Sequence, residues 1–190
     1  MTVNLTPLAV SVLALLCERA MHPYEMYRLM ISRHEDEIVK VRPGSLYHTV
    51  DRLAGAEQVE AVGSDREGGR PERTTYRITS EGRATLREWI RDVLATPTNE
   101  FPRFPVALGE AHNLPRLEVV DLLRMRISAI ESELARIAVL MAANHPSERE
   151  PYLIAAHYGV EMRNAELDWL RKVADRLENK EMEWPLEERA

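Results

Sequence analysis

The chain has 190 residues, of which 45% are hydrophobic and 29% are charged. This is an ordinary composition for a soluble globular protein of one large or two small domains. The longest apolar stretch, residues 7–17, is too short to span a bilayer, and no basic segment before it predicts a signal peptide. The single cysteine, Cys17, excludes an intramolecular disulfide. We therefore expect a cytoplasmic protein with no membrane partner.

The net charge of −6 is unevenly distributed along the chain. Residues 1–95 carry 13 basic and 14 acidic side chains, whereas residues 96–190 carry 12 and 17. Domains that bind nucleic acid are often strongly basic, and neither half meets that description. Any binding to DNA would therefore rely on a few well-placed arginines or on dimerisation.

Capping signals and helical spacing predict three helices in the first 55 residues. Thr6 and Pro7 begin a helix that reaches about Arg19, and Pro23 begins a second that ends near Arg33. After a Pro-Gly turn, Ser45 is a suitable N-cap for a third helix. Its core-facing residues follow the i, i+4, i+7 spacing and are Leu46, Val50 and Leu53.

Two short strands are predicted next, at residues 59–63 and 74–78, separated by a loop rich in glycine and charge. Thr79 or Ser80 then caps a fourth helix. The predicted buried stripe of that helix is Leu86, Trp89, Ile90 and Val93. Three helices, a two-stranded hairpin and a further helix are typical of a winged helix-turn-helix domain. The predicted fold class is therefore mainly α with a small β-wing.

The third helix and the hairpin together carry side chains suited to reading DNA. A major groove admits one helix, and short polar side chains or arginine on its outer face can reach base edges. Arginines in a wing can follow the backbone or enter the minor groove. The alternative is a solvated helix face and a charged surface hairpin. The residues predicted to bind DNA are Ser45, Tyr47, His48 and Arg52 on the helix and Arg66, Arg70 and Arg73 in the hairpin.

A proline-rich linker at residues 96–113 separates the predicted DNA-binding domain, residues 1–95, from a helical domain at residues 114–190. In the helical domain, apolar residues from Val120 to Met141 recur with 3-4 spacing over three heptads. The last helix is apolar on two sides, so it needs cover on two sides. One neighbouring helix covers one side, and we expect a second chain to cover the other, as a homodimer. Burial under the first domain is the alternative. The residues predicted to serve dimerisation are Ile127, Ile130, Leu134, Leu167 and Leu170.

Other chemistries find little support in the sequence. The six histidines are scattered, no paired Cys and His ligands occur, and the i, i+4 pair His157 and Glu161 supplies two metal ligands at most. No phosphate-binding glycine loop and no nucleophile elbow around Ser45 are present. We therefore predict no enzyme activity, no catalytic residues, no metal and no cofactor. A small enzyme or a metal sensor built on residues 153–177 is the remaining rival of that kind.

Several short motifs resemble the PadR-type transcriptional regulators. They are Leu13-Ala14-Leu15-Leu16, His22-Pro23-Tyr24-Glu25-Met26, Gly44-Ser45-Leu46-Tyr47, Arg52-Leu53, Gly69-Arg70, Thr75-Tyr76-Arg77-Ile78-Thr79, Gly82 and Trp89. The two long helices of the second half, with Glu161 and Trp169-Leu170, resemble the C-terminal dimerisation domain of the longer members. The chain departs from the family pattern at Pro23, at His48 and in the turn at residues 55–58.

The resemblance implies a dimeric repressor that binds double-stranded DNA at a palindromic promoter operator, with one third helix in each half-site. It also implies that a small-molecule effector, or a change in dimer geometry, relieves repression. The alternative function is a winged helix that binds another protein and reads no DNA sequence. Candidate effector-pocket residues, for which ordinary core packing is the competing interpretation, are Tyr24, Trp89, Phe104, His157, Tyr158, Met162 and Trp169.

Overall fold

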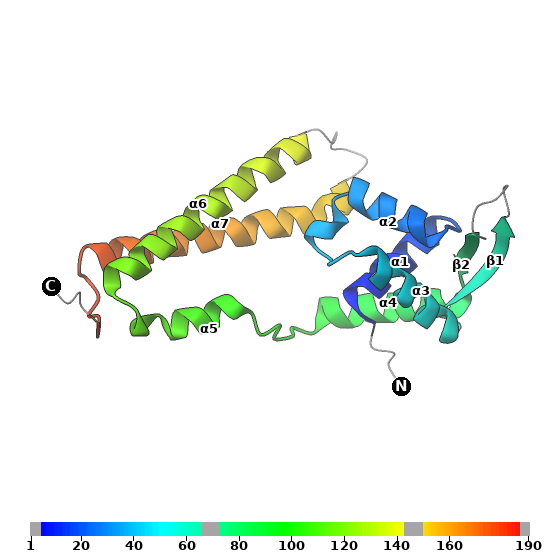
Figure 1. Cartoon of the computed structure of the whole chain (residues 1–190), viewed down its shortest axis with the longest axis horizontal. Coiled ribbons are helices and arrows are strands. Elements are labelled where there is room, and N and C mark those ends of the chain that lie inside the picture. The colour runs from blue at the N-terminus through cyan, green and yellow to red at the C-terminus, as the bar shows by residue number, and fades with distance from the viewer. Residues whose placement is uncertain (1–4, 66–72, 143–149, 187–190) are drawn as a thin grey trace. The chain divides into compact units, whose positions relative to one another are not determined.

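The computed structural model describes residues 5–65, 73–142 and 150–186, and it divides the chain into two compact units, Met1–Asn99 and Glu100–Ala190 (Figure 1). Within the described residues it is mainly helical, with one two-stranded antiparallel sheet. The predicted fold class is therefore confirmed. None of the helices in the described part of the chain is both long enough and apolar enough to cross a membrane.

The first unit begins with helices whose starts follow the predicted caps. In α1, Pro7–Glu18, the Thr6 hydroxyl accepts a hydrogen bond from the Ala9 N–H at 3.3 Å. In α2, Pro23–Ser32, Nδ1 of His22 accepts from the Tyr24 N–H at 3.1 Å. Both helices have proline in the first turn, where its missing N–H costs nothing. A short 3-10 helix, η1, follows at Glu35–Glu37.

The third helix, α3, spans Pro43–Gly55, so it begins three residues earlier than predicted. Arg42 is its N-cap residue, and no side chain caps its first turn. Ser45 was therefore wrongly predicted as the N-cap. The fixed backbone angle of proline favours the first helical position, and Pro43 occupies it in this chain.

Strands β1, Val59–Asp65, and β2, Arg73–Ile78, form the antiparallel wing of the predicted domain. Val59 pairs with Ile78 at its base, and the register shifts between Ala61 and Gly63, as at a β-bulge. The backbone of Met21 adds an isolated bridge to Tyr76, with two hydrogen bonds of 3.0 Å. The segment between α1 and α2 is thereby joined to the sheet.

Helix α4, Ser80–Ala95, packs against the base of the wing. The Thr79 hydroxyl caps it by accepting from the Gly82 N–H at 3.0 Å. A Cβ on Gly82 would lie 2.1 Å from the Gln58 carbonyl oxygen, so only glycine fits there. Of the predicted stripe, Leu86 is buried and Trp89 is partly buried, whereas Ile90 and Val93 are about two-fifths exposed. The stripe prediction was wrong for those last two residues.

The core of this unit is formed by apolar residues from each of the four α-helices and the wing. Its largest fully buried side chains include Leu13 and Leu16 of α1, Met26 and Met30 of α2, and Leu46 of α3. Because α3 buries one face in this core, its other face is left on the surface.

The second unit is a pair of long helices, α6, Arg116–Ala142, and α7, Glu150–Glu178, preceded by α5, Arg103–Gly109, and a short η2, Ala111–Asn113 (Figure 1). Helices α5 and η2 fall inside the segment predicted to be a linker. The heptad residues of α6 pack against α7 of the same chain, and the buried residues are Val119, Val120, Leu123, Ile127, Ile130, Leu167, Leu170, Ala174 and Leu177.

Ion pairs flank this packed seam and fix the register of α6 against α7. Arg124 pairs with Asp175 and Glu178, at 2.7 and 2.8 Å, and Arg171 pairs with Glu131 at 2.6 Å. At the carboxyl end of α7, the buried guanidinium of Arg116 donates to the Leu177 carbonyl. A cation suits the free carbonyls at a helix C-terminus.

Candidate nucleic-acid interface

Helix α3 divides its side chains sharply between core and surface. Leu46, Thr49, Val50 and Leu53 are buried, and the Thr49 hydroxyl donates to the Ser45 carbonyl at 2.8 Å. The residues between them point outward because each residue turns the helix by about 100°. The buried side thus aims the opposite side of α3 at solvent.

The exposed side contains all four of the helix residues predicted to bind DNA. Ser45, His48 and Arg52 recur at i, i+3 and i+7, so they lie along one edge of that side, and each is exposed. Tyr47 lies at the other edge and is 41% exposed. Its ring meets the His22 ring edge-on, with centroids 6.1 Å apart. This arrangement presents one row of hydrogen-bonding groups and one aromatic ring.

Arg52 is tethered to the start of α1. Its guanidinium donates to the Thr6 hydroxyl at 3.2 Å, and that same hydroxyl caps α1. The contact is exposed, so it orients the guanidinium without withdrawing it from solvent. Arg52 therefore retains donors for another acceptor.

The start of α3 adds positive groups that the sequence interpretation missed. Arg42 is the N-cap residue and Lys40 precedes it, and both are exposed, with no carboxylate partner in the described part of the chain. The N–H groups of the first helical turn have no side-chain cap. Free N–H groups at a helix N-terminus favour a phosphate. The signal in the sequence was a pair of basic residues one and three positions before Pro43.

The wing supplies a second strip of surface. Glu60 of β1 faces Arg77 of β2 across the ladder, and the two form an ion pair at 2.8 Å. Two of the predicted wing arginines, Arg66 and Arg70, lie outside the described residues. Arg73 begins β2, where its backbone pairs with Asp65, and its side chain is outside the described set.

One acidic group, Asp51, lies on the exposed side of α3 and near the wing. Burial, and to a smaller extent the negative charge of Asp51, raise the pKa of Tyr76 on β2. The exposed side of α3 and the central part of the wing are therefore electrostatically coupled.

Two ion pairs connect the carboxyl end of α1 to the two ends of α2. Arg33 forms a two-pronged contact with Glu18, at 2.5 and 2.9 Å, and Arg19 pairs with Glu25. The hydrogen bond from Arg33 lowers the pKa of Glu18, and that from Arg19 lowers the pKa of Glu25. These pairs neutralise acidic groups of a unit that has almost no net charge.

The candidate effector residues fall in both units. In the first, Tyr24 is exposed and Trp89 packs against the core. In the second, Phe104 is partly buried at α5, whereas four residues of α7 are exposed: His157, Tyr158, Met162 and Trp169. Core packing, the competing interpretation, describes Trp89 and Phe104. An effector role for the set stays a prediction.

The five residues predicted to serve dimerisation lie on the inner side of the α6–α7 pair. Ile127, Ile130, Leu167 and Leu170 are buried within one chain, and Leu134 packs beside them. The second apolar side of α7 is exposed, and its large side chains are Ile154, Tyr158, Met162 and Trp169.

No group of three or more His, Cys, Asp or Glu side chains is placed to hold a metal ion in the ranges that the structure covers. His157 and Glu161 are both exposed on α7. Two exposed ligands one helical turn apart leave most of a coordination sphere unfilled.

Residues 12–88 match the model of the transcriptional regulator PadR-like family. Among solved structures, the chain is similar to Bacillus subtilis PadR in complex with operator DNA, at 15% identity over 90% of this chain and 99% of that one, with a TM-score of 0.74. The same protein in complex with p-coumaric acid matches at 16% identity over 92% and 99%, with a TM-score of 0.68. A PadR-like transcriptional regulator from Bacillus cereus matches at 18% over 91% and 99%, with a TM-score of 0.63. No curated protein matches the sequence.

Because the sequence identities are only 15–18%, the solved structures show a shared fold, which extends over nearly the whole chain. The family match is confined to the winged helix. The matched region contains α2, α3 and the β1–β2 wing, together with the second half of α1 and the first half of α4. Members of this family are transcriptional regulators and not enzymes. Residues 12–88 of this chain, which lie in its winged-helix unit, are thus similar in sequence to the PadR-like family of transcriptional regulators, and the chain shares the fold of the solved PadR structures.

Proposed function

We propose that this protein is a dimeric repressor that binds a palindromic promoter operator through α3 and the wing. The observation that carries the proposal is the exposed side of α3. It holds Ser45, His48 and Arg52 in one row on a helix whose opposite side is buried. Arginine can bind guanine through two hydrogen bonds, and histidine and serine can donate or accept at other base edges.

The uncapped start of α3 supports the same proposal. A helix N-terminus with Arg42 and Lys40 beside it suits a DNA phosphate, which would fix the register of the helix. The wing arginines, Arg66, Arg70 and Arg73, would then contact the backbone or the neighbouring minor groove. Base contacts from α3 would supply specificity, and phosphate contacts would supply most of the affinity.

Dimerisation is supported by the outer row of α7. Ile154 and Tyr158 are each 67% exposed, and Met162 and Trp169 are nearly half exposed. Large apolar side chains gathered along one helix face are typical of an interaction surface. In the proposed dimer these rows meet around a two-fold axis, and the two α3 helices occupy successive major grooves about 34 Å apart. Occupancy of a promoter by this dimer blocks transcription, and such a repressor acts in the cytoplasm.

Release by a small molecule is the last part of the proposal. The neighbouring Bacillus subtilis PadR structure is a complex with p-coumaric acid, so a protein of this fold holds a small ligand. An effector can only release operator DNA from this protein if it binds one dimer geometry more tightly than the other. Its effect would be a change in the separation of the two α3 helices.

Fluorescence anisotropy of the full chain on its own upstream promoter DNA tests the DNA proposal. We expect tight, competitor-resistant binding that weakens steeply with salt. Arg52→Ala should cost about 1–3 kcal/mol of specific binding, and Arg70→Ala should lower affinity for all sequences and reduce the salt slope by about 1. Arg87→Ala removes the same charge from the exposed surface of α4 and is the matched control. Unchanged affinity in both test variants would refute these site assignments.

A winged helix that binds another protein is the second candidate. The near-neutral charge of residues 1–95 favours it, because such a unit has little general attraction for DNA. Binding to the promoter that is no tighter than binding to random DNA, with little dependence on salt, would support this alternative over the first proposal.

A further inference from the structure

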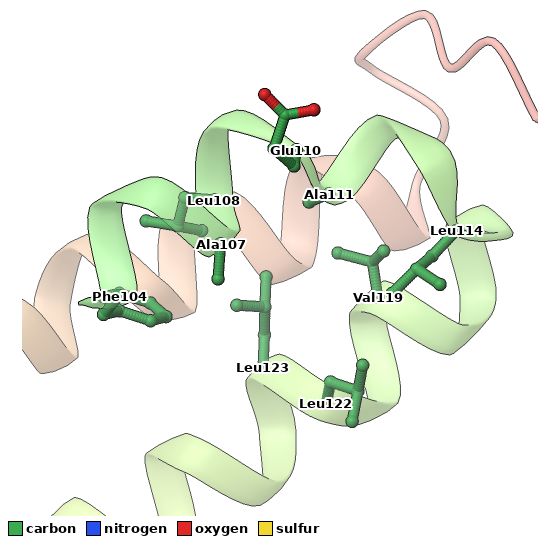
Figure 2. A pocket seen from close by; sticks show the side chains of 9 residues that line it. All are labelled: Phe104, Ala107, Leu108, Glu110, Ala111, Leu114, Val119, Leu122 and Leu123. Carbon is green, nitrogen blue, oxygen red and sulfur yellow. The ribbon is translucent and has the colours of Figure 1, made fainter.

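A pocket of about 170 Å³ lies in the second unit, between α5 with η2 on one side and the first turns of α6 on the other (Figure 2). Eight of its nine lining residues are apolar. In Figure 2, Leu123 of α6 points toward Ala107 of α5 across the pocket, and the carboxylate of Glu110 points away from it. Glu110 is also engaged elsewhere, since Asn113 donates to its Oε2 at 3.2 Å.

Two of the lining residues, Phe104 and Leu114, make contacts with residues that do not line the pocket. Phe104 is covered by the guanidinium of Arg126, 3.5 Å above its ring, and that guanidinium is itself paired with Glu166. On the other side, the Trp184 indole N–H donates to the Leu114 carbonyl at 2.8 Å. These contacts fix two residues of the pocket lining, one at each end of the α5–η2 segment.

We propose that this pocket is a binding site for a small uncharged apolar ligand, about the size of one aromatic ring. The pocket is open to solvent, since Ala107 and Leu122 are exposed, and its volume is close to that of an apolar cavity that accepts benzene. No lining side chain aims a polar atom into the space, so a ligand carboxylate or ammonium would lose its water with nothing to replace it. The apolar lining therefore favours the neutral ligand when two ligands have a similar shape and only one of them is charged.

The effect of such a ligand on DNA rests on the proposed function, but its binding does not. The pocket is formed entirely by residues of the second unit, Phe104 to Leu123. Binding is therefore measured on the full chain without DNA, and a failure of the operator experiment leaves that measurement intact.

Toluene and benzoate are suitable probes, because they share a ring and differ in a methyl group against a carboxylate. Methyl NMR spectra of the full chain are recorded with each probe. We expect toluene to shift the methyl signals of Leu108, Leu114 and Leu123, and benzoate to leave them in place. Shifts of equal size with both probes, or no shift with toluene, would overturn the proposal.

Ala107→Leu fills the pocket from an exposed position of α5 and should raise the toluene Kd by about tenfold or more. Ala84→Leu makes the same change on the exposed surface of α4 and should leave the Kd unchanged. If Ala107→Leu loses helical signal, Leu122→Phe is the second filling variant. Toluene binding that survives in a folded filling variant would contradict the proposed site. Pocket signals that shift when the protein is diluted would also contradict it, because they would mean that a second copy of the chain covers the pocket.

Discussion

The two units of this chain bury their apolar residues in different ways. The winged helix has helices and a wing around one core, and its functional side, on α3, is polar. The α6–α7 pair has a single packed seam, and α7 leaves Ile154, Tyr158, Met162 and Trp169 on the surface. The first unit also leaves single apolar residues exposed, such as Ile90 and Val93, whereas the second exposes a row of large apolar side chains along one helix, which is typical of an interaction surface. The proposed DNA reading and the proposed assembly thus use separate surfaces.

The largest effect on stability is expected at Gly82, where α4 comes close to the backbone at the base of the wing. Gly82→Ala would place a Cβ 2.1 Å from the backbone oxygen of Gln58, which a side-chain rotation cannot relieve. We expect a loss of about 3 kcal/mol or more in the free energy of unfolding, measured by urea denaturation.

Gly159→Ala in α7 is the control, because a Cβ there would meet nothing within 4 Å. Alanine has the higher helix propensity, so we expect unchanged stability or a gain of about 1 kcal/mol. If Gly82→Ala behaved like this control, the close approach of α4 to the base of the wing would be wrong.

The seam of the second unit comes next. Leu170 is fully buried between α6 and α7, and Leu170→Ala should cost about 3 kcal/mol by leaving a cavity. Val139→Ala, at a 70% exposed position of α6, should cost less than about 0.5 kcal/mol. Thermal unfolding followed by circular dichroism compares the two. Equal costs would mean that the seam is not the core of this unit.

The outer row of α7 separates folding from assembly. A variant with Tyr158→Glu and Met162→Glu places two charges on the exposed row, and we expect the dimer Kd to rise about 100-fold or more. Helical content should stay unchanged, because neither side chain belongs to the buried seam. Analytical ultracentrifugation gives the Kd. A dimer of unaltered strength would place the interface elsewhere.

A matched control variant makes the same net change in charge at a different part of the α7 surface. Asp168 and Lys172 are exposed on α7 outside the apolar row. Asp168→Glu with Lys172→Glu should leave the dimer Kd within about tenfold of the wild-type value. A larger rise would show that the added negative charge, rather than the apolar row, controls assembly.

The smallest expected effect is the acid sensitivity of the α1–α2 ion pair. The hydrogen bond from Arg33 lowers the pKa of Glu18 in the folded chain below the ordinary value of 4.5. The stability that the ionised carboxylate contributes is therefore present above pH 4.5 and is lost as the pH falls through the folded-state pKa. Both side chains are more than two-fifths exposed, so solvent screening keeps the contribution small.

Glu18→Gln should accordingly be less stable than the wild type near neutral pH, and the difference should shrink below pH 4.5. Urea midpoints measured at several pH values check this. Glu88→Gln, at an exposed site on α4, is the control for removing one carboxylate. A difference that grows as the pH falls would mean that Arg33 does not stabilise the ionised form of Glu18.

Regular spacing made much of this fold predictable. The i, i+4, i+7 pattern of Leu46, Val50 and Leu53 identified the buried side of α3, and the two apolar rows of α7 separated into one buried and one exposed row. Helix starts at Thr6-Pro7 and at Pro23 followed local capping chemistry. These features depend on residues within one or two helical turns, so a single sequence contains them.

Features that depend on distant partners could not be predicted. Arg116 is buried because it meets the last carbonyls of α7, far along the chain. Ile90 and Val93 continue a helical apolar stripe, yet the core of the first unit ends before them. For the candidate site, the row on α3 followed from helical spacing, whereas the role of Arg42 depended on where the helix begins. The DNA contacts of each residue stay predictions.

The bridge between Met21 and Tyr76 has a consequence for the folding pathway. It closes a loop that contains α2, α3 and the whole of β1, so it forms only after those segments have approached their final places. Such long-range pairing slows folding and couples the hairpin to the helices in one cooperative transition. The amide hydrogen of Tyr76 should then exchange with solvent only when the entire unit opens, while amides at the ends of α4 exchange by local fraying.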